Sequence, residues 1–269
     1  MELLIGCDPE LFVSKGGQFI SGHTIPLGTK LQPKVTKHGA LQNDGLALEF
    51  NTDPAAKPQD FLKNIQHTLS DLRSEVALAE PAAELASIPT VHFGRDYLRG
   101  LPREVQELGC SPDFSAYTGL ENSKPNANVD FRTGAGHVHL GWTYGAFSAE
   151  HFNRCCAITR ELDYYLGLPS LSWDKDAERR SLYGQAGAFR PKTYGVEYRV
   201  LSNAWVLKDD LCLFIFNQSK KAFNSVMLAK EGRPTLFEQY GSFAQDCINN
   251  SVHDWQELVS QELNKSIHK

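Results

Sequence analysis

The sequence has no apolar run long enough to cross a membrane. The longest candidate, Leu211–Phe216, is far shorter than the roughly 20 apolar residues that a spanning helix needs. The first residues, Met-Glu-Leu-Leu-Ile-Gly-Cys, lack the basic start of a secretory signal, and their apolar stretch is too short to form one. We therefore expect a cytoplasmic protein that has no membrane partner.

Positive charge is also scarce. The formal net charge is -5, the sequence pI is about 6.0, and no run of like charge is long enough to form a tail. Because general nucleic-acid binding depends on a basic surface, this balance argues against a nucleic-acid partner.

Paired cysteines are missing too. None of the six cysteines forms a C-x-x-C pair, and most of them sit among apolar residues. This usage is typical of reduced core thiols in a cytosolic protein. Cys7, which lies beside Asp8, is the one with a chemically interesting neighbour, but packing is the favoured interpretation.

The chain does contain enough apolar sequence for a sizeable core. Its 269 residues, 41 % of them hydrophobic, suit a single domain over residues 1–269. Strands are predicted at 3–6, 11–20, 44–50, 87–94, 129–142 and 194–201, with loops at 21–43, 95–130 and 167–193. Helices are predicted at 58–78, 150–166, 209–230, 234–249 and 252–265, so the C-terminal third is mostly helical. Because strands and helices are partly segregated, the predicted class is α+β with an antiparallel or mixed sheet.

Four short runs of the sequence carry polar residues two positions apart, and all of these residues except Asn51 are ionisable. In one of them, His137 and His139 alternate with apolar residues, and glycines stand on both sides. Side chains two apart on a strand share a face, so the two imidazoles share one. They suit a transition metal, a magnesium site beside carboxylates, or a phosphate contact. The other three runs contain Asp8-Pro-Glu10, Glu49-Phe-Asn51 and Glu197-Tyr-Arg199, and we predict that all four line one face of one sheet.

The acidic residues of these runs favour a hard cation. Asp8 and Glu10 form either a magnesium ligand pair or a solvated strand face. Glu49 lies between Leu48 and Phe50, where a glutamate is rare unless it is paired or binds a metal. Asp44 precedes a glycine and reads as a turn residue.

Basic residues gather between positions 179 and 199. This segment contains a single acidic residue, Glu197. Its basic residues are Arg179, Arg180, Arg190, Lys192 and Arg199. Such a surplus near glycines suits a clamp for polyphosphate, although a solvated basic loop has the same composition. Glu197 and Arg199 share a strand face, so they either pair with one another or hold a metal ion and a phosphoryl group respectively.

Taken together and in order, five motifs resemble the phage-type carboxylate–amine ligases of the glutamine synthetase and glutamate–cysteine ligase superfamily. The motifs are Gly6-Cys-Asp8-Pro-Glu10-Leu-Phe, Asn43-Asp44…Glu49-Phe-Asn51, Gly109-Cys-Ser-Pro-Asp113-Phe…Tyr117, Gly136-His137-Val-His139-Leu-Gly141, and Tyr194-Gly-Val-Glu197-Tyr-Arg199-Val-Leu-Ser…Trp205. They cover roughly residues 1 to 225.

The resemblance implies a curved antiparallel sheet that forms an active-site funnel, with helices packed outside it. It implies ATP and two or three Mg²⁺ or Mn²⁺ ions in the funnel. Metal ligands would be Asp8, Glu10, Glu49, Glu197 and either His137 or His139. Arg199 would contact phosphate, and Arg179, Arg180 and Arg190 fit a phosphate-binding loop more loosely. The first acid is Asp where the superfamily usually has Glu, and no separate small N-terminal domain is visible.

The residues and the resemblance predict the same reaction. ATP would activate a small-molecule or peptide carboxylate as an acyl phosphate, and an amine would then form an amide. Arg199, Arg190 and Glu49 are the expected catalytic residues, and Lys192 is expected among the nucleotide contacts. A phage-encoded protein of this kind would work in the host cytoplasm. Two rivals remain, namely a zinc hydrolase built on His137 and His139 and a non-catalytic nucleotide-binding relative.

Overall fold

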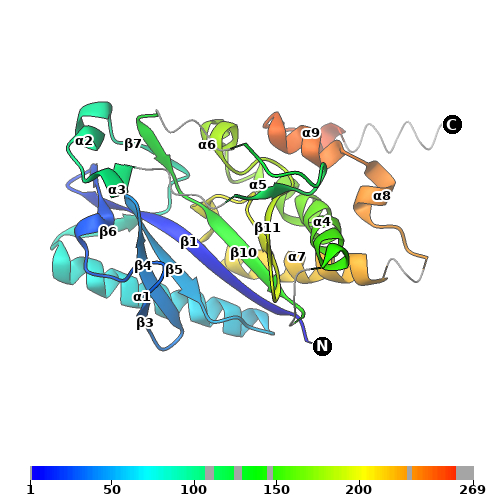
Figure 1. Cartoon of the computed structure of the whole chain (residues 1–269), viewed down its shortest axis with the longest axis horizontal. Coiled ribbons are helices and arrows are strands. Elements are labelled where there is room, and N and C mark those ends of the chain that lie inside the picture. The colour runs from blue at the N-terminus through cyan, green and yellow to red at the C-terminus, as the bar shows by residue number, and fades with distance from the viewer. Residues whose placement is uncertain (1, 107–111, 124–128, 144–147, 229–231, 259–269) are drawn as a thin grey trace.

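Figure 1 shows the computed structural model of the chain, in which a long sheet lies across several helices. The structure describes residues 2–106, 112–123, 129–143, 148–228 and 232–258. Its strands are β1 (Leu4–Lys15), β2 (Gln18–Ile20), β3 (Lys34–Val35), β4 (Gly39–Asp44), β5 (Ala47–Thr52), β6 (Ala83–Ala86), β7 (Thr90–His92), β8 (Phe114–Ser115), β9 (Phe131–Thr133), β10 (Gly136–Gly141), β11 (Ala188–Lys192) and β12 (Gly195–Tyr198).

The α-helices are α1 (Pro58–Ala79), α2 (Arg95–Arg99), α3 (Arg103–Gln106), α4 (Ala149–Leu162), α5 (Leu168–Ser170), α6 (Ala177–Leu182), α7 (Asp209–Leu228), α8 (Leu236–Tyr240) and α9 (Phe243–Asn249). Short 3-10 turns, η1 (Gly22–Thr24) and η3 (Asn203–Trp205), and one π-helical turn, η2 (Asp163–Gly167), connect them. In the part of the chain that is described, no helix is long and apolar enough to cross a membrane.

The large sheet has the strand order β3-β4-β5-β1-β10-β12-β11-β8, and β2 and β6 pair with one end of β1. Every pairing between described strands is antiparallel. The predicted α+β class with an antiparallel sheet is therefore confirmed. β7 and β9 form a separate small ribbon.

β1 is the central strand, and it differs from the prediction. We expected two short strands with a break near Asp8-Pro-Glu10, but one strand of 12 residues runs through all of them. Pro9 is tolerated because β1 changes partner beside it. Leu4 to Pro9 pair with β10, whereas Glu10 and Leu11 pair with β5.

The strand predicted at 44–50 is in fact the turn and second strand of a hairpin. β4 and β5 pair along their whole length, and the chain reverses at Gly45 and Leu46. Gly45 has φ +59, which favours a residue without a side chain. The predicted loop 21–43 thus contains a strand, because Gly39–Asp44 finds its partner only after the chain has turned.

Other predicted boundaries shift in the same way. The strand expected at 129–142 is interrupted between β9 and β10, and the strand expected at 194–201 is shorter. Of the strand expected at 87–94 only β7 forms, and β6 ends just before it. The loops 95–130 and 167–193 contain short elements, including α6 and β11. The motif start at 109–111 and the last part of the predicted helix 252–265 lie outside the described residues.

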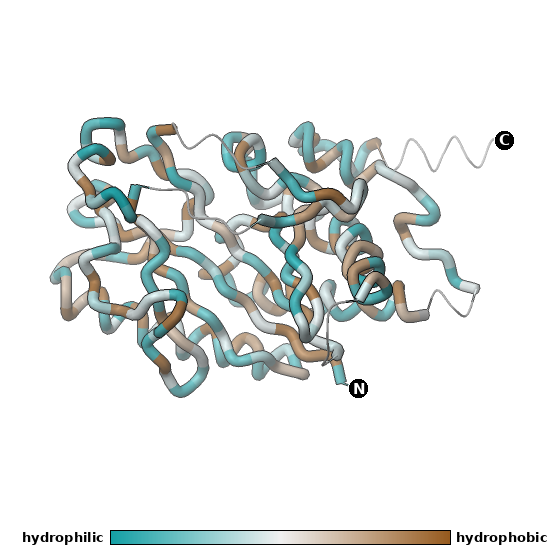
Figure 2. The backbone as a smooth tube through the Cα atoms, viewed as in Figure 1, coloured by the Kyte–Doolittle hydropathy of each residue, from teal (hydrophilic) through white to brown (hydrophobic). Residues whose placement is uncertain are grey.

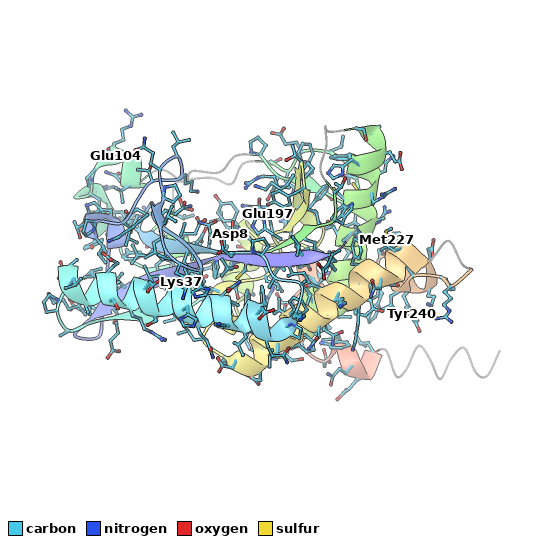
Figure 3. The ribbon with its side chains drawn as sticks, turned by 90° about the horizontal axis from the view of Figure 1, so that it is seen from below. Asp8, Lys37, Glu104, Glu197, Met227 and Tyr240 are labelled. Atoms are coloured by element: carbon cyan, nitrogen blue, oxygen red, sulfur yellow. The ribbon has the colours of Figure 1, made fainter. Side chains whose placement is uncertain are left out.

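The two faces of the large sheet differ in chemistry. Along β1, β10 and β12, residues such as Cys7, Val138 and Val196 point to one face and are buried in the main core. α1, α4 and α7 cover this face, and α7 contacts both of the other helices. Figure 3 shows α1 and α7 side by side under the sheet, with Asp8 and Glu197 close together beyond it. The alternating colours along these strands in Figure 2 follow from this period of two.

A buried carboxylate attaches the C-terminal segment to the helical layer. Glu161 in α4 has no exposed surface, and it accepts hydrogen bonds from the Ser225 hydroxyl (2.8 Å) and from the amides of Leu236 (2.9 Å) and Phe237 (3.1 Å). These two amides belong to the first turn of α8, whose donors have no partner within the helix. The contacts therefore fix the place where the chain returns after α7.

A second buried carboxylate lies in η2, where the helix widens. Asp163 has no exposed surface, and it accepts hydrogen bonds from the hydroxyls of Tyr117 (2.8 Å) and Tyr198 (2.7 Å). Burial raises the pKa of Asp163 to about 7, although both hydroxyls act to lower it. The carboxyl group is therefore neutral in mildly acidic solution and ionised in mildly basic solution.

We expect the stability of the protein to fall as the pH rises through 7. The folded-state pKa of Asp163 is above the ordinary value of 3.8, so its contribution is fully present below pH 3.8 and is lost up to about pH 7. The full loss is roughly 4 kcal/mol, and most of it falls between about pH 4 and pH 7. Asp163→Asn should remove this part of the pH dependence, measured by urea unfolding at about pH 4 and pH 7. The exposed Asp254→Asn should keep it, and an unchanged slope in Asp163→Asn would contradict the assignment.

Candidate active site

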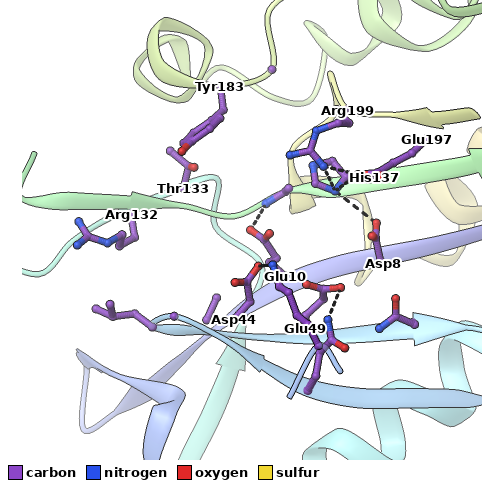
Figure 4. Close-up of a pocket in the computed structure, with 18 of the residues that line it drawn as sticks. Asp8, Glu10, Asp44, Glu49, Arg132, Thr133, His137, Tyr183, Glu197 and Arg199 are labelled. Atoms are coloured by element: carbon purple, nitrogen blue, oxygen red, sulfur yellow. Dashed lines mark hydrogen bonds and ion pairs between the residues drawn. The ribbon is translucent and has the colours of Figure 1, made fainter. Parts of the chain in front are cut away.

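The antiparallel register places the ionisable residues of four strands on one face. Asp8 lies opposite His137, and Glu10 lies opposite Glu49. His139 lies opposite Glu197, which in turn lies opposite Arg190. The prediction that the four runs share one sheet face is thereby confirmed, and Figure 4 shows several of these side chains converging from neighbouring strands.

A polar pocket of about 610 Å³ opens over this face. It is lined by residues from β1, β4, β5, β10, β11 and β12 and from the connections between them. The ionisable lining residues are Asp8, Glu10, Lys30, Asp44, Glu49, Asp113, Arg132, His137, Arg179, Arg190, Lys192, Glu197 and Arg199. A pocket lined by many acidic and many basic side chains suits a substrate that is itself highly charged.

One cluster in this site has the composition of a metal site. Asp8, His139 and Glu197 each offer one ligand atom, and these atoms lie within 4.8 Å of one another. His139 Nε2 is 3.1 Å from Asp8 Oδ2, but the contact lacks hydrogen-bond geometry, so the buried Nε2 has no hydrogen-bond partner. Asp8 Oδ1 is likewise buried without one. Unpartnered ligand atoms of this kind fit a bound cation.

The other ring nitrogen of His139 has a partner of its own. Nδ1 lies 2.6 Å from the hydroxyl of Tyr194. A hydrogen bond at one nitrogen fixes the ring orientation and leaves the other free for a metal ion. Burial lowers the pKa of His139, but Asp8 outweighs this effect and the net shift is upward. Conversely, burial would raise the pKa of Asp8, but His139 and then His137 bring it well below its usual value.

His137 takes a different place. Its Nδ1 is 3.4 Å from Asp8 Oδ1 and 3.4 Å from a guanidinium nitrogen of Arg199. Burial and then Arg199 lower the pKa of His137 to about 4, so the ring is neutral at physiological pH. The sequence left open which histidine binds a metal, and the geometry favours His139, with His137 between the metal cluster and Arg199.

A second cluster consists of carboxylates alone. Glu10, Asp44 and Glu49 offer oxygens within 4.8 Å of one another. Glu10 also accepts a hydrogen bond from the Ala135 amide (2.9 Å), and Glu49 accepts one from the Gln42 amide group (2.9 Å). Asp44 was expected to be a turn residue only. In the sequence, the signal for a role in the site was that Asp44 belongs to one of the family motifs, Asn43-Asp44…Glu49-Phe-Asn51.

Burial and then repulsion between carboxylates raise the pKa of two members of this cluster, Glu10 and Glu49. Burial and then Asp44 raise the pKa of Glu10 to about 7. Burial and then Asp8 raise the pKa of Glu49 well above its ordinary value. Lys30, 2.8 Å from Asp44, supplies the nearby positive charge that the sequence did not reveal. A hard divalent cation bound by oxygen ligands would neutralise such a cluster, so the residues present fit Mg²⁺ or Mn²⁺.

Three cations surround the carboxylate of Glu197. Lys192 lies 2.7 Å and Arg190 lies 3.0 Å from its oxygens, and Arg199 makes a close contact as well. Burial and then Asp8 would raise the pKa of Glu197, but Arg199 and the two histidines bring it to about 2. Arg199 also pairs with Asp113 at 3.1 Å. Glu197 is thus ionised throughout the physiological range.

The two remaining arginines that were predicted to bind phosphate, Arg179 and Arg180, lie in different places. Arg179 lines the pocket, but two of its nitrogens donate to the carbonyls of Val200 and Leu201, both at 2.8 Å. Gly184, at φ +77, allows this approach, because a Cβ there would lie 2.1 Å from Arg179. Arg180 lies outside the pocket, paired with buried Asp174 at 3.4 Å. Consecutive residues of α6 point in different directions, so its position does not support the predicted phosphate contact.

A second, apolar pocket of about 350 Å³ lies beyond His139. Leu4, Cys7, Pro54, Trp142 and Tyr194 contribute to its lining. Trp142 is 4 % exposed, and its indole N–H has no hydrogen-bond partner. A planar ligand with a hydrogen-bond acceptor would fit these walls. Asp8 and Glu197 line the polar pocket and His139 lines the apolar one, so this candidate metal cluster lies between the two pockets.

Comparison with known proteins gives a family match over part of the chain. Residues 118–233, less than half of the sequence, match the model described as phage phiEco32-like COOH.NH2 ligase-type 2. No curated protein matches the chain in sequence.

Solved structures give distant similarities. A novel glutamine synthase homolog has a TM-score of 0.44 and 12 % identity over 93 % of this chain. GmaS without ligand has a TM-score of 0.43 and 10 % identity over 98 %. A bifunctional glutathione synthetase from Pasteurella multocida has a TM-score of 0.38 and 10 % identity over 97 %. The chain spans 61 %, 70 % and 49 % of these structures, respectively.

The matched segment contains His137, His139, Glu197 and Arg199, so the family match falls on the strands that build half of the site. The family resemblance drawn from the motifs is thereby confirmed. Over residues 118–233 the chain is therefore similar to this family of carboxylate–amine ligases.

Proposed function

We propose that the protein is an ATP-dependent ligase that joins a carboxylate to an amine through an acyl phosphate. The observation that carries this proposal is the pair of clusters Asp8–His139–Glu197 and Glu10–Asp44–Glu49 beside Arg190 and Arg199. All of these residues line the polar pocket except His139, which lines the adjoining apolar pocket. Both reacting groups, the carboxylate and the γ-phosphate, are negatively charged. Transfer of the phosphoryl group therefore needs positive charge beside each of them. This pocket holds residues for both purposes.

The two pockets suggest how the substrates lie. The apolar pocket suits a nucleotide base, whose phosphates would then reach past His139 towards Glu197 and the basic residues. The polar pocket would take the acid and the amine. Divalent ions held by the two clusters would neutralise the phosphate oxygens and the attacking carboxylate. The arginine fork of Arg199, fixed by Asp113, would orient the moving phosphoryl group.

In the first step an oxygen of the substrate carboxylate attacks the γ-phosphorus, and ADP leaves with the bridging oxygen. In the second step the neutral amine attacks the acyl carbon, and the amide forms as phosphate and a proton are released. Water must be kept from the acyl phosphate between the two steps. His137, neutral and held beside Arg199, positions that guanidinium without adding charge.

The zinc hydrolase alternative needs two imidazoles on one ion. Among the described residues, each candidate metal cluster contains at most one histidine, and the other ligands are carboxylates. This set favours Mg²⁺ or Mn²⁺ over zinc. The structure therefore gives no support to a site in which His137 and His139 share zinc.

Isotope transfer tests the proposed reaction directly. Incubation with ATP, Mg²⁺ and a panel of amino acids should identify an acid that stimulates phosphate release. With that acid labelled by ¹⁸O in its carboxylate, the proposal predicts one labelled oxygen in the released phosphate for each amide formed. Amide formation with unlabelled phosphate would rule out the acyl phosphate.

Glu49→Ala should abolish ADP formation in the same assay, because it removes a carboxylate from the second cluster. We expect a loss of about 10²-fold or more, the scale of a lost preorganised electrostatic contact. Circular dichroism should show the fold retained, since the change relieves repulsion between buried carboxylates. Glu84→Ala on β6 is the control, with unchanged turnover. Retained turnover in Glu49→Ala would count against this site.

A further inference from the structure

Lys192 differs from the other two cations around Glu197 in how firmly it is held. Arg199 is also bound by Asp113 at 3.1 Å, and a nitrogen of Arg190 approaches the carbonyl of Pro112 at 3.4 Å. For Lys192, Glu197 is the one acid within ion-pair distance of the ammonium among the residues that the structure describes. Its side chain is 29 % exposed, and Lys192 is the last residue of the strand β11. Of the three cations, Lys192 is therefore the one that can most easily dissociate from Glu197.

The ammonium of Lys192 binds a carboxylate that belongs to the first cluster. Its Nζ lies 2.7 Å from Glu197 Oε2, and Glu197 is one of the three residues that offer ligand atoms to a common cation. A divalent ion binds a carboxylate oxygen at about 2.1 Å. An ion on Oε2 would thus lie within about 5 Å of the ammonium, in a site shielded from water. The two positive charges would repel each other strongly.

We propose that Lys192 is an internal counter-cation that a divalent ion displaces from Glu197, and that the displaced ammonium then binds the phosphates of the nucleotide. The side chain already lines the polar pocket, and its four-carbon stem is flexible enough to change partners. Metal and nucleotide would consequently bind with positive coupling. This inference rests on the proposed function, because it assumes that a nucleotide with its metal enters this pocket.

Binding measurements with Mn²⁺ alone test the proposal without any turnover. Free Mn²⁺ is followed by electron paramagnetic resonance, with and without a non-hydrolysable ATP analogue. For the unmodified protein we expect the analogue to tighten Mn²⁺ binding by about 10-fold or more, and Mn²⁺ to tighten analogue binding by the same factor. For Lys192→Met we expect Mn²⁺ alone to bind about 10-fold more tightly, with the coupling reduced to about threefold or less.

Two further variants separate the possible failures. Lys220→Met, an exposed position on α7, should bind both ligands as the unmodified protein does. Glu197→Gln should weaken Mn²⁺ binding, which shows that the measured ion occupies this cluster. If it does so, and Lys192→Met binds Mn²⁺ no more tightly than the unmodified protein, the counter-cation role is overturned while the proposed function stands. If the analogue does not bind, or Glu197→Gln leaves Mn²⁺ binding unchanged, the proposed function itself fails and the inference fails with it.

Discussion

Glu197→Gln is expected to lower the rate of ATP-dependent amide formation by about 10³-fold or more. Glu197 contributes to the first cluster and neutralises three cations, so the amide would weaken cation binding and disturb the phosphate contacts at once. Loss of one preorganised electrostatic contact alone commonly lowers kcat by about 10²–10³-fold. Phosphate release and amide formation measure the effect.

The same variant should also be less stable. The carboxylate is 1 % exposed, and its loss breaks its ion pairs with three cations, which for a buried ion pair typically costs about 3–5 kcal/mol. Urea unfolding without metal or nucleotide checks this separately from activity. Glu84→Gln, an exposed glutamate on β6, is the matched control and should change neither quantity. Turnover of Glu197→Gln close to that of the unmodified protein would refute the assignment of this cluster.

Arg199→Lys is expected to lower kcat by about 10²-fold although the charge is kept. The guanidinium contacts Asp113, Glu197 and His137 at the same time, and its planar fork matches a phosphoryl group. An ammonium is a single point of contact and cannot hold all three neighbours. Steady-state kinetics with ATP should show a larger effect on kcat than on KM, because the contact is needed most as the phosphoryl group moves.

Arg154→Lys is the control for this substitution. Arg154 pairs with Glu150 on α4, and it lines neither pocket, so the variant should keep normal kinetics. If Arg199→Lys behaves in the same way as Arg154→Lys, then Arg199 has a structural role and does not contact the transferred group.

The sequence revealed the polar face of the sheet well because strands have a simple period. Asp8 and Glu10, His137 and His139, and Glu197 and Arg199 are each two residues apart, so each pair had to share a face. Their convergence required strands distant in sequence to become neighbours, and the ordered family motifs supplied that information. The α+β class followed from the placement of helical patterns after Asp209.

The parts that the sequence did not reveal depend on three-dimensional pairing. Asp44 looked like a turn residue, because its partner strand begins only after the reversal at Gly45. Lys30 gave no signal, since it reaches the site through an ion pair that has no local pattern. The arginines of α6 were treated as one group, although helix geometry sends Arg179 towards the pocket and Arg180 away from it.

The unbroken course of β1 has a consequence for the chemistry. Asp8 and Glu10 belong to different acidic clusters but to the same strand, with only Pro9 between them. Two residues of an extended backbone advance by about 6.6 Å. The separation of the two ligand groups is therefore determined by covalent geometry and is independent of any loop. Inserting a single residue between them would turn one carboxylate into the apolar core, so the two positions can only change together.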